Sequence, residues 1–344
     1  MTGRKQGGLF GDLPPPRKGG GRARPVEPAP PRDEDAATAE SLPPSIRLGT
    51  SSWSFPGWKG IVWSGDASER KLSREGLEAY ARHPLLRCVG LDRTHYAPMT
   101  VEQYRAHAAQ VPDGFRFLVK AHEASTIRRW PDHPRYGARR GETNPLFLDA
   151  RAAADAGVAP TVEGLGDRLG VLLFQVAPQS LKGAGGPAGF VDALHRFLAA
   201  LPRGPRYAVE VRNRELLTDA YAAALRDVGA LHCLSVHPRL PPLDEQAHAA
   251  GVDAQPELLV RWMLRAGLDY SAAVERYAPF DRIVDEDPPT RRAVADLAAV
   301  AARKSRPVTV VVNNKAEGSS PLSVFALAAE IARRLDRPTA DPIV

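Results

Sequence analysis

The stretch LGVLLFQV, residues 169–176, is apolar at every position except Gly170 and Gln175. Strands buried on both faces read as such continuous runs, whereas antiparallel strands with one wet face alternate apolar and polar residues. We therefore interpret this stretch as a buried strand of a parallel sheet. Seven further short β-rich runs occur along the chain, at 46–50, 86–91, 115–121, 206–211, 230–236, 257–262 and 307–313.

Helical patterns separate most of these runs. Strand and helix alternate eight times over about 290 residues, which is the size and rhythm of a (β/α)₈ TIM barrel. A doubly wound open α/β sheet is the alternative, because spacing alone cannot show closure. No G-x-G-x-x-G follows the first strand, which disfavours the nucleotide-binding form of that alternative. The expected helices are 73–83, 100–111, 188–201, 218–229 and 289–304, in a barrel domain spanning 46–340.

Residues 1–45 are rich in Pro, Gly and Arg and show almost no periodic apolar pattern, so we predict a disordered tail. The exception is QGGLFG, in which Gln6, Leu9 and Phe10 form a Q-x-x-L-F sequence. It resembles the peptide by which bacterial proteins bind the DNA polymerase sliding clamp, where two apolar side chains enter a pocket. The alternative is an ordinary tail that matches by chance.

Bulk composition points to a cytoplasmic, soluble protein. No apolar run is long enough for a membrane helix, and the N-terminus lacks the apolar segment of a secretory signal. Cys88 and Cys233 lie in strand-like runs and read as buried free thiols. The net charge of +6 weakly favours anionic partners, nucleic acid included. Only eight of the 46 basic residues are lysines, and a lysine can titrate where an arginine cannot.

The catalytic candidates are Glu210 and Lys120, because TIM barrels build their active sites at the carboxyl ends of the strands. Glu210 follows YAV and would act as general acid or base, or else form a buried ion pair. Lys120 follows FRFLV and should be partly desolvated, which suits an acid, a base or an anion clamp, although it could also extend its charge to solvent.

Other strand-end residues are candidates for substrate binding. An anionic group would be held by arginine, and hydroxyls would be held by amides. The amides could instead organise a polar network or turn the chain, and the tryptophans of the loop after the first strand could plug the core rather than line a pocket. The candidates are Arg212 and Arg261, Asp92, the amides Gln175, Asn313 and Asn314, and an apolar wall of Trp53 and Trp58.

A metal site would require convergence of residues from four strand ends, namely Asp92, His122, Glu210 and His237. No H-x-H, H-E-x-x-H or C-x-x-C spacing supports one, so we expect neither a metal nor another cofactor. A Walker A loop and a G-x-S-x-G elbow are also missing from the sequence. The long connection 122–168 suggests a lid or side wall over the strand ends.

Five ordered motifs resemble the YecE-like family, also called domain of unknown function 72. The resemblance spans about residues 46–335 and implies a TIM barrel without an established reaction. The chain departs from the family where VGLDRTHY places Gly90 and Asp92 in the positions of a usual Glu and Asn, and where His237 replaces a frequent acidic residue. The motifs are LGTSSWSFPGWKG (48–60), FRFLVKA (115–121), LGVLLFQVAP (169–178), YAVEVRN (207–213) and VVVNNKAEGSSP (310–321).

The leading hypothesis is an enzyme that acts on a small anionic or polyhydroxylated substrate by metal-independent acid–base chemistry of Glu210 and Lys120. One alternative is a DNA-associated barrel, recruited through residues 6–10 and contacting phosphates with the arginine-rich connection. A non-catalytic barrel that only binds a ligand is the other alternative, given Gly90.

Overall fold

The strands close into a barrel in chain order. The computed structural model describes residues 25–265 and 267–337. Each strand pairs with the next, and β8 pairs in parallel with β1, which excludes the open sheet and confirms the TIM barrel. The strands are β1 Ile46–Thr50, β2 Leu86–Leu91, β3 Arg116–Lys120, β4 Leu169–Val176, β5 Tyr207–Val211, β6 Leu231–Val236, β7 Leu258–Trp262 and β8 Val308–Val312.

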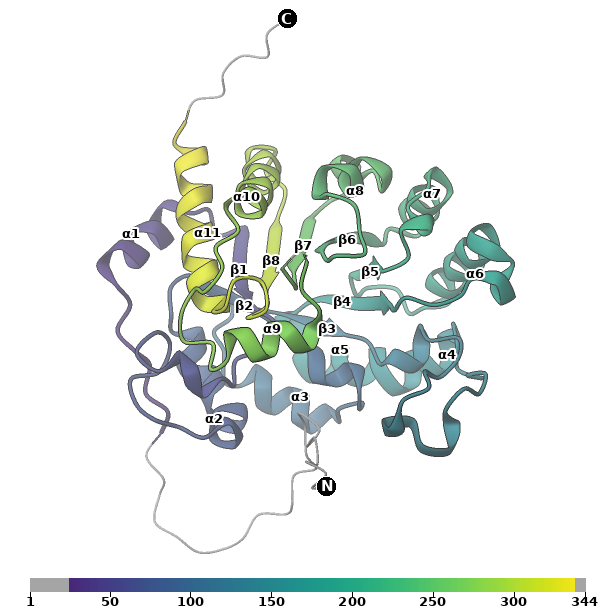
Figure 1. Ribbon diagram of the computed structural model, residues 1–344, viewed down its shortest axis with the longest axis horizontal. Coiled ribbons are helices and arrows are strands. Elements are labelled where there is room, and N and C mark those ends of the chain that lie inside the picture. The colour runs from purple at the N-terminus through teal and green to yellow at the C-terminus, as the bar shows by residue number, and fades with distance from the viewer. Residues whose placement is uncertain (1–24, 266, 338–344) are drawn as a thin grey trace, which may run out of the picture.

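Helices surround the barrel (Figure 1). Those at predicted positions are α2 Glu69–Ala81, α3 Val101–Ala108, α6 Gly186–Ala200, α7 Asp219–Val228 and α10 Pro288–Arg303. Helix α2 begins four residues earlier than predicted because the Ser68 side chain caps it, accepting a hydrogen bond from the Lys71 amide. The prediction did not specify α8 Leu243–Ala249, α9 Tyr270–Tyr277 or α11 Ser320–Leu335. Across the described residues we find no helix with the length and apolarity of a membrane span.

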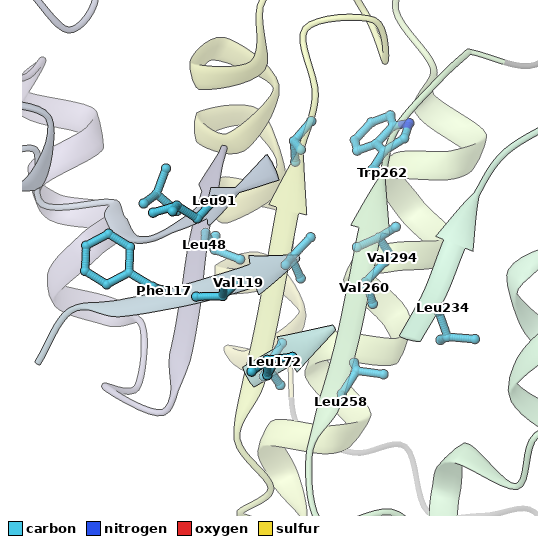
Figure 2. Packing of buried hydrophobic residues seen from close by; sticks show 14 of the residues in the cluster. Leu48, Leu91, Phe117, Val119, Leu172, Leu234, Leu258, Val260, Trp262 and Val294 are labelled. Carbon is cyan, nitrogen blue, oxygen red and sulfur yellow. The ribbon is translucent and has the colours of Figure 1, made fainter. Parts of the chain in front are cut away.

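Successive side chains of each strand point alternately towards the helices and into the barrel. The outward residues form the main core with the helices. Figure 2 shows Val260 and Trp262 of β7 in the same buried cluster as Val294 of α10. The inward residues at mid-height form a second cluster, here called the apolar band, which consists of Cys88, Leu118, Val171, Leu173, Ala208, Leu231, Cys233, Leu259 and Val311. Both cysteines are buried free thiols, as predicted.

The disordered tail that we predicted over residues 1–45 includes a segment that is folded. Residues 25–45 are folded and include α1 Asp33–Ser41, which lies beside α11 (Figure 1). Arg87 fixes the end of α1 by donating to the carbonyl oxygen of Ala39 at 2.6 Å. Few apolar residues mark this segment, so its pattern gave little sign of burial. Gln6, Leu9 and Phe10 lie outside the described residues.

The long connection after β3 folds into its own substructure. It contains two 3-10 turns, Glu123–Ser125 and Pro134–Arg139, and then α4 Ala150–Ala153, a π-helical turn and α5 Ala159–Leu165. Helix α5 packs closely on α3 at Gly164, where an added Cβ would lie 2.3 Å from the Cβ of Tyr104. The backbones approach each other there because glycine has no side chain.

Candidate active site at the carboxyl ends of the strands

A cavity of about 490 Å³ opens at the carboxyl ends of the strands, above the apolar band. Small-molecule sites typically have this volume and this position in a TIM barrel. The inward positions just beyond the apolar band are polar, so strand alternation brings their side chains together. The predicted site residues that line the cavity are Asp92, Lys120, Gln175, Arg212, Arg261 and Asn313.

Arg261 lies at the centre of the hydrogen-bond network below the cavity and is fully buried. Its Nη1 donates to Glu210 Oε2 at 2.5 Å and to Gln175 Oε1 at 3.2 Å. Its Nη2 donates to both carboxylate oxygens of Asp92, at 3.0 and 2.9 Å. One guanidinium therefore links β4, β5 and the segment just after β2, and two carboxylates flank it.

Glu210 is enclosed by two guanidinium groups. Its side chain is fully buried, with Oε1 paired to Arg212 and Oε2 to Arg261. Burial raises the pKa of this carboxyl, but Arg212 and Arg261 together outweigh burial and lower the pKa to about 2. Glu210 does not line the cavity. This geometry favours a buried ion pair, the alternative that the sequence left open, over proton transfer by Glu210.

Two lysines line the cavity in a different environment. Burial lowers the pKa of Lys120 to about 8, against the opposing effect of the Asp92 carboxylate. Burial likewise lowers the pKa of Lys315 to about 8, and its ammonium lies 4.3 Å from the centroid of the Tyr270 ring. Neither lysine forms an ion pair with a carboxylate of the described residues. Both can therefore titrate near neutral pH and can bind an anion.

Asn313 organises the loop that carries Lys315. Its Nδ2 donates to Ser51 Oγ at 2.7 Å, and its Oδ1 accepts from the backbone amide of Lys315 at 3.0 Å. The nearby His237 is neutral at physiological pH, because burial and the charge of Arg212 lower its pKa to about 4. The cavity lining thus combines the two lysines and neutral hydrogen-bonding groups with the charged side chains of Asp92, Arg212 and Arg261.

The prediction that Trp53 and Trp58 form the cavity wall is wrong. Trp53 is buried and donates its Nε1–H to the carbonyl oxygen of Leu72. Trp58 is fully buried and stacks on Trp63 with ring centroids 6.2 Å apart. These rings plug the space between the first loop and α2, because hydrogen bonds and stacking turn them away from the barrel mouth.

Other apolar residues supply the wall instead. Phe55 comes from the loop after β1, Leu264 and Leu268 come from the segment between β7 and α9, and Tyr270 is the first residue of α9. Sequence reasoning missed them because the β7 loop has no distinctive pattern. Lys315 lies among the strand-end residues but was not a candidate for catalysis or substrate binding, although the scarcity of lysine in this chain was a usable signal.

Asn314 is likewise not a ligand-binding residue. It is buried, and its Oδ1 accepts hydrogen bonds from the amide and hydroxyl of Ser320, each at 2.8 Å. These bonds secure the start of α11, so this amide has a structural role, one of the two alternatives the sequence allowed.

The four residues considered for a metal site do not converge. In residues 25–265 and 267–337 no group of three His, Cys, Asp or Glu side chains is placed to hold a metal ion. Asp92 and Glu210 instead flank the Arg261 guanidinium. His122 caps a 3-10 turn, accepting from the Ala124 amide at 3.2 Å.

The long connection braces the cavity without covering it. None of residues 122–168 lines the cavity. The Arg135 guanidinium lies over the ring of Tyr96, which does line it, at 4.9 Å from the ring centroid. Arg135 in turn donates to buried Glu123 at 2.7 Å. The connection therefore supports one side wall, and the predicted lid is not observed.

A closed (β/α)₈ barrel with a polar cavity at the carboxyl ends of its strands defines this chain as a TIM-barrel protein. Residues 47–342 match the family model described as "Protein of unknown function DUF72", and the chain belongs to this family. A search of the curated proteins found no match.

Solved structures of the family share the fold. A DUF72 family protein of Enterococcus faecalis at 3.10 Å resolution aligns with a TM-score of 0.54 and 18% identity, covering 85% of this chain and 96% of that one. A second Enterococcus faecalis structure, at 2.52 Å, gives 0.50 and 14%, covering 85% and 98%. A Thermotoga maritima DUF72 family protein gives 0.48 and 17%, covering 85% and 99%.

Gly90 in β2 is tightly enclosed. A Cβ added there would lie 3.0 Å from the Cα and 3.1 Å from the carbonyl oxygen of Ser51. A larger residue would require the backbone just after β1 to shift. The inward position at this level is therefore empty of a side chain, and Asp92, two residues further on, supplies the acidic group that Arg261 binds.

Proposed function

We propose that this protein is an enzyme that binds a small anionic substrate in the cavity at the carboxyl ends of the strands and transfers a proton through Lys120. The observation that carries the proposal is the pair Lys120 and Lys315, two desolvated ammonium groups without a carboxylate partner among the described residues. The carboxylates of Asp92 and Glu210 are already matched by the guanidinium groups of Arg261 and Arg212. The surplus positive charge favours a carboxylate or phosphate group on the substrate.

The two lysines differ in their surroundings, which supports different roles. Lys120 is 7% exposed and is the last residue of β3, where pairing with β4 fixes its backbone. A pKa of about 8 leaves part of the population neutral at pH 7, and a neutral amine can accept a proton from the substrate. Lys315 lies on a loop against Tyr270 and is suited to hold the anionic group.

Glu210 in this proposal is a positioning residue. It holds Arg261 and Arg212 in place, and their charges help to keep the pKa of Lys120 low. Gln175 uses its carbonyl oxygen for Arg261, and no acceptor of the described residues binds its amide nitrogen. That amide is available for a substrate hydroxyl, while Phe55 and Tyr270 cover the apolar part of the substrate.

The test begins with a thermal-shift panel of small carboxylic acids and sugar phosphates on the wild-type chain, followed by turnover assays on each stabilising compound. Lys315→Met should raise KM with little change in kcat. Lys120→Met should lower kcat by about 10²-fold or more, the usual contribution of a positioned proton-transfer group. Lys59→Met is the matched control, because Lys59 is half-exposed and pairs with Asp66 on the surface.

The outcomes separate the enzyme from a non-catalytic barrel. Ligand binding without turnover of any stabilising compound would leave the binding-only alternative. Wild-type kcat in Lys120→Met would refute proton transfer by this residue. Recovery of activity in Lys120→Arg would do the same, because guanidinium does not titrate near neutral pH.

We also propose that Gln6, Leu9 and Phe10 bind the DNA polymerase sliding clamp. Support comes from the Q-x-x-L-F sequence, which lies outside the described residues. The double variant Leu9→Ala/Phe10→Ala should lose binding to purified clamp, and no binding by the intact protein would end the proposal. A cytoplasmic location is consistent with the two free thiols.

A further inference from the structure

The opposite end of the barrel carries an unusual interior layer. Arg47 and Arg116 lie at inward positions of β1 and β3, and Arg206 and Glu257 come one residue before β5 and β7; each is two residues before the level of the apolar band. Alternate strands supply one layer of a TIM-barrel interior, and such layers normally consist of branched apolar residues. These four residues, here called the amino-end layer, place three guanidinium groups and one carboxylate where apolar packing is the rule.

The one carboxylate of this layer already forms an ion pair and a hydrogen bond. Glu257 is buried, pairs with Arg206 and accepts from the hydroxyl of Thr309 at 2.8 Å. Arg116 donates to the backbone carbonyl oxygens of Asp113 and Phe115, at 2.6 and 2.9 Å, and to no carboxylate of the described residues. Only one of the three guanidinium groups therefore has an anionic partner.

Arg47 has the fewest interactions that offset its positive charge. Within the described residues it forms neither a hydrogen bond nor an ion pair, and its buried Nε–H has no acceptor. Burial and the charge of Arg47 together lower the pKa of Arg116, and the same two causes lower the pKa of Arg87 on the neighbouring strand. Like charges are thus held together at the base of the barrel, an arrangement that an anion would stabilise.

A cavity of about 1020 Å³ gives access to this layer from solvent. The loop arginines Arg168 and Arg203 also line it. Arg168 pairs with Asp113, and Arg203 forms no ion pair with any described residue. Five arginines face three carboxylates across the whole lining, so the cavity carries a net charge of +2.

We propose that this cavity is a binding site for a small ligand that carries two or more phosphate groups. Guanidinium groups bind phosphate through two parallel hydrogen bonds, and Arg47, Arg116 and Arg203 all have donors that no carboxylate uses. A ligand with at least two negative charges balances the excess charge of the lining. The site lies beyond the apolar band from the cavity of Lys120, so it is independent of the proposed enzymatic function.

The test is isothermal titration calorimetry of the full chain with inorganic triphosphate at fixed ionic strength. Arg47→Met should weaken binding about tenfold or more, since it removes a charged hydrogen-bond donor. The same variant should melt at a higher temperature without ligand, because it removes the repulsion between Arg47 and the guanidinium groups of Arg116 and Arg87. Arg47→Lys keeps the charge but loses the paired donors and should bind with intermediate affinity. Arg74→Met is the control, because Arg74 is exposed and pairs with Glu75 on α2.

The remaining arms locate the site and define its ligand. Lys120→Met should bind triphosphate as the wild type does. If Lys120→Met loses binding and Arg47→Met keeps it, the ligand lies in the other cavity and the proposal is overturned. Orthophosphate that binds as tightly as triphosphate would refute the requirement for two phosphates. Binding of a 5′-phosphorylated oligonucleotide without any binding of triphosphate would overturn the small-ligand site.

Discussion

Replacing Arg261 with methionine should destabilise the protein more than removing any surface arginine. The substitution removes the guanidinium that binds Glu210, Gln175 and Asp92 and leaves apolar volume in its place. Removing one partner of a buried ion pair typically costs about 3–5 kcal/mol. Glu210 keeps Arg212, and the Asp92 side chain is 27% exposed and can be hydrated, so we expect the lower end, about 3 kcal/mol.

That free energy converts into a measurable shift in melting temperature. An unfolding entropy of about 2.1 cal/mol/K per residue over roughly 310 folded residues gives about 0.65 kcal/mol/K. A loss of about 3 kcal/mol then lowers Tm by about 5 °C. Circular dichroism during heating and urea denaturation at pH 7 measure both quantities, with the exposed Arg74→Met as a control expected to change stability by less than about 1 kcal/mol.

A double-mutant cycle isolates the pair. Arg261→Met combined with Glu210→Gln should be less destabilised than the sum of the single variants by at least about 1 kcal/mol, because the second change neutralises a carboxylate that the first leaves with one cation fewer. A loss below about 1 kcal/mol in Arg261→Met, or strictly additive effects, would refute the view that Arg261 compensates two carboxylates.

Three further predictions concern charge and chain boundaries. The pKa of Lys120 falls from 10.5 to about 8 on folding, so the unfolded chain binds more protons between these pH values and stability should rise with pH there. Lys120→Met should accordingly raise the free energy of unfolding by up to about 3 kcal/mol at pH 7, and this gain should shrink above pH 8. Urea denaturation at pH 7 and above pH 8 measures the difference, and a lower stability of the variant would contradict the prediction. The pKa of Glu210 is lowered from 4.5 to about 2, so its contribution to stability is complete above pH 4.5 and is lost as pH falls towards 2. In the same assay, the free energy of unfolding of Glu210→Gln should fall by up to about 3 kcal/mol less than that of the wild type over this pH range. An equal fall in both proteins would refute the assignment. Removal of residues 1–24 should leave Tm unchanged, whereas removal of 1–45 should lower it by several degrees through loss of the contact between α1 and α11; equal melting of the two truncations would contradict the packing of α1.

The barrel could be predicted from the sequence because its strands are apolar on both faces. Val308–Val312 and Leu169–Val176 show this directly, since helices cover the outside and the apolar band fills the inside. Much of the cavity lining followed from the same logic, because residues after a buried parallel strand must lie at its carboxyl end. Lys120, Arg212 and Arg261 were found in this way.

The remaining features depend on contacts that periodicity does not encode. Trp53 turns away from the barrel mouth because the Leu72 carbonyl accepts its N–H, a partner 19 residues away. Glu210 reads as a reactive carboxylate until Arg212 and Arg261 are known to enclose it. Helix α1 has so few large apolar residues that only its position against α11 reveals that it is folded.

The apolar band has a consequence for how this protein can change over time. A layer of Leu, Val, Ala and Cys side chains without ionised groups separates the two cavities at the ends of the barrel, and no side-chain hydrogen bond or ion pair of the described residues joins the two linings. The stability effects of substitutions around one cavity should therefore add to those of substitutions around the other within about 0.5 kcal/mol. Each cavity can acquire or lose a ligand without changing the contacts of the ionisable side chains in the other cavity. One barrel can therefore carry two binding specificities that evolve separately.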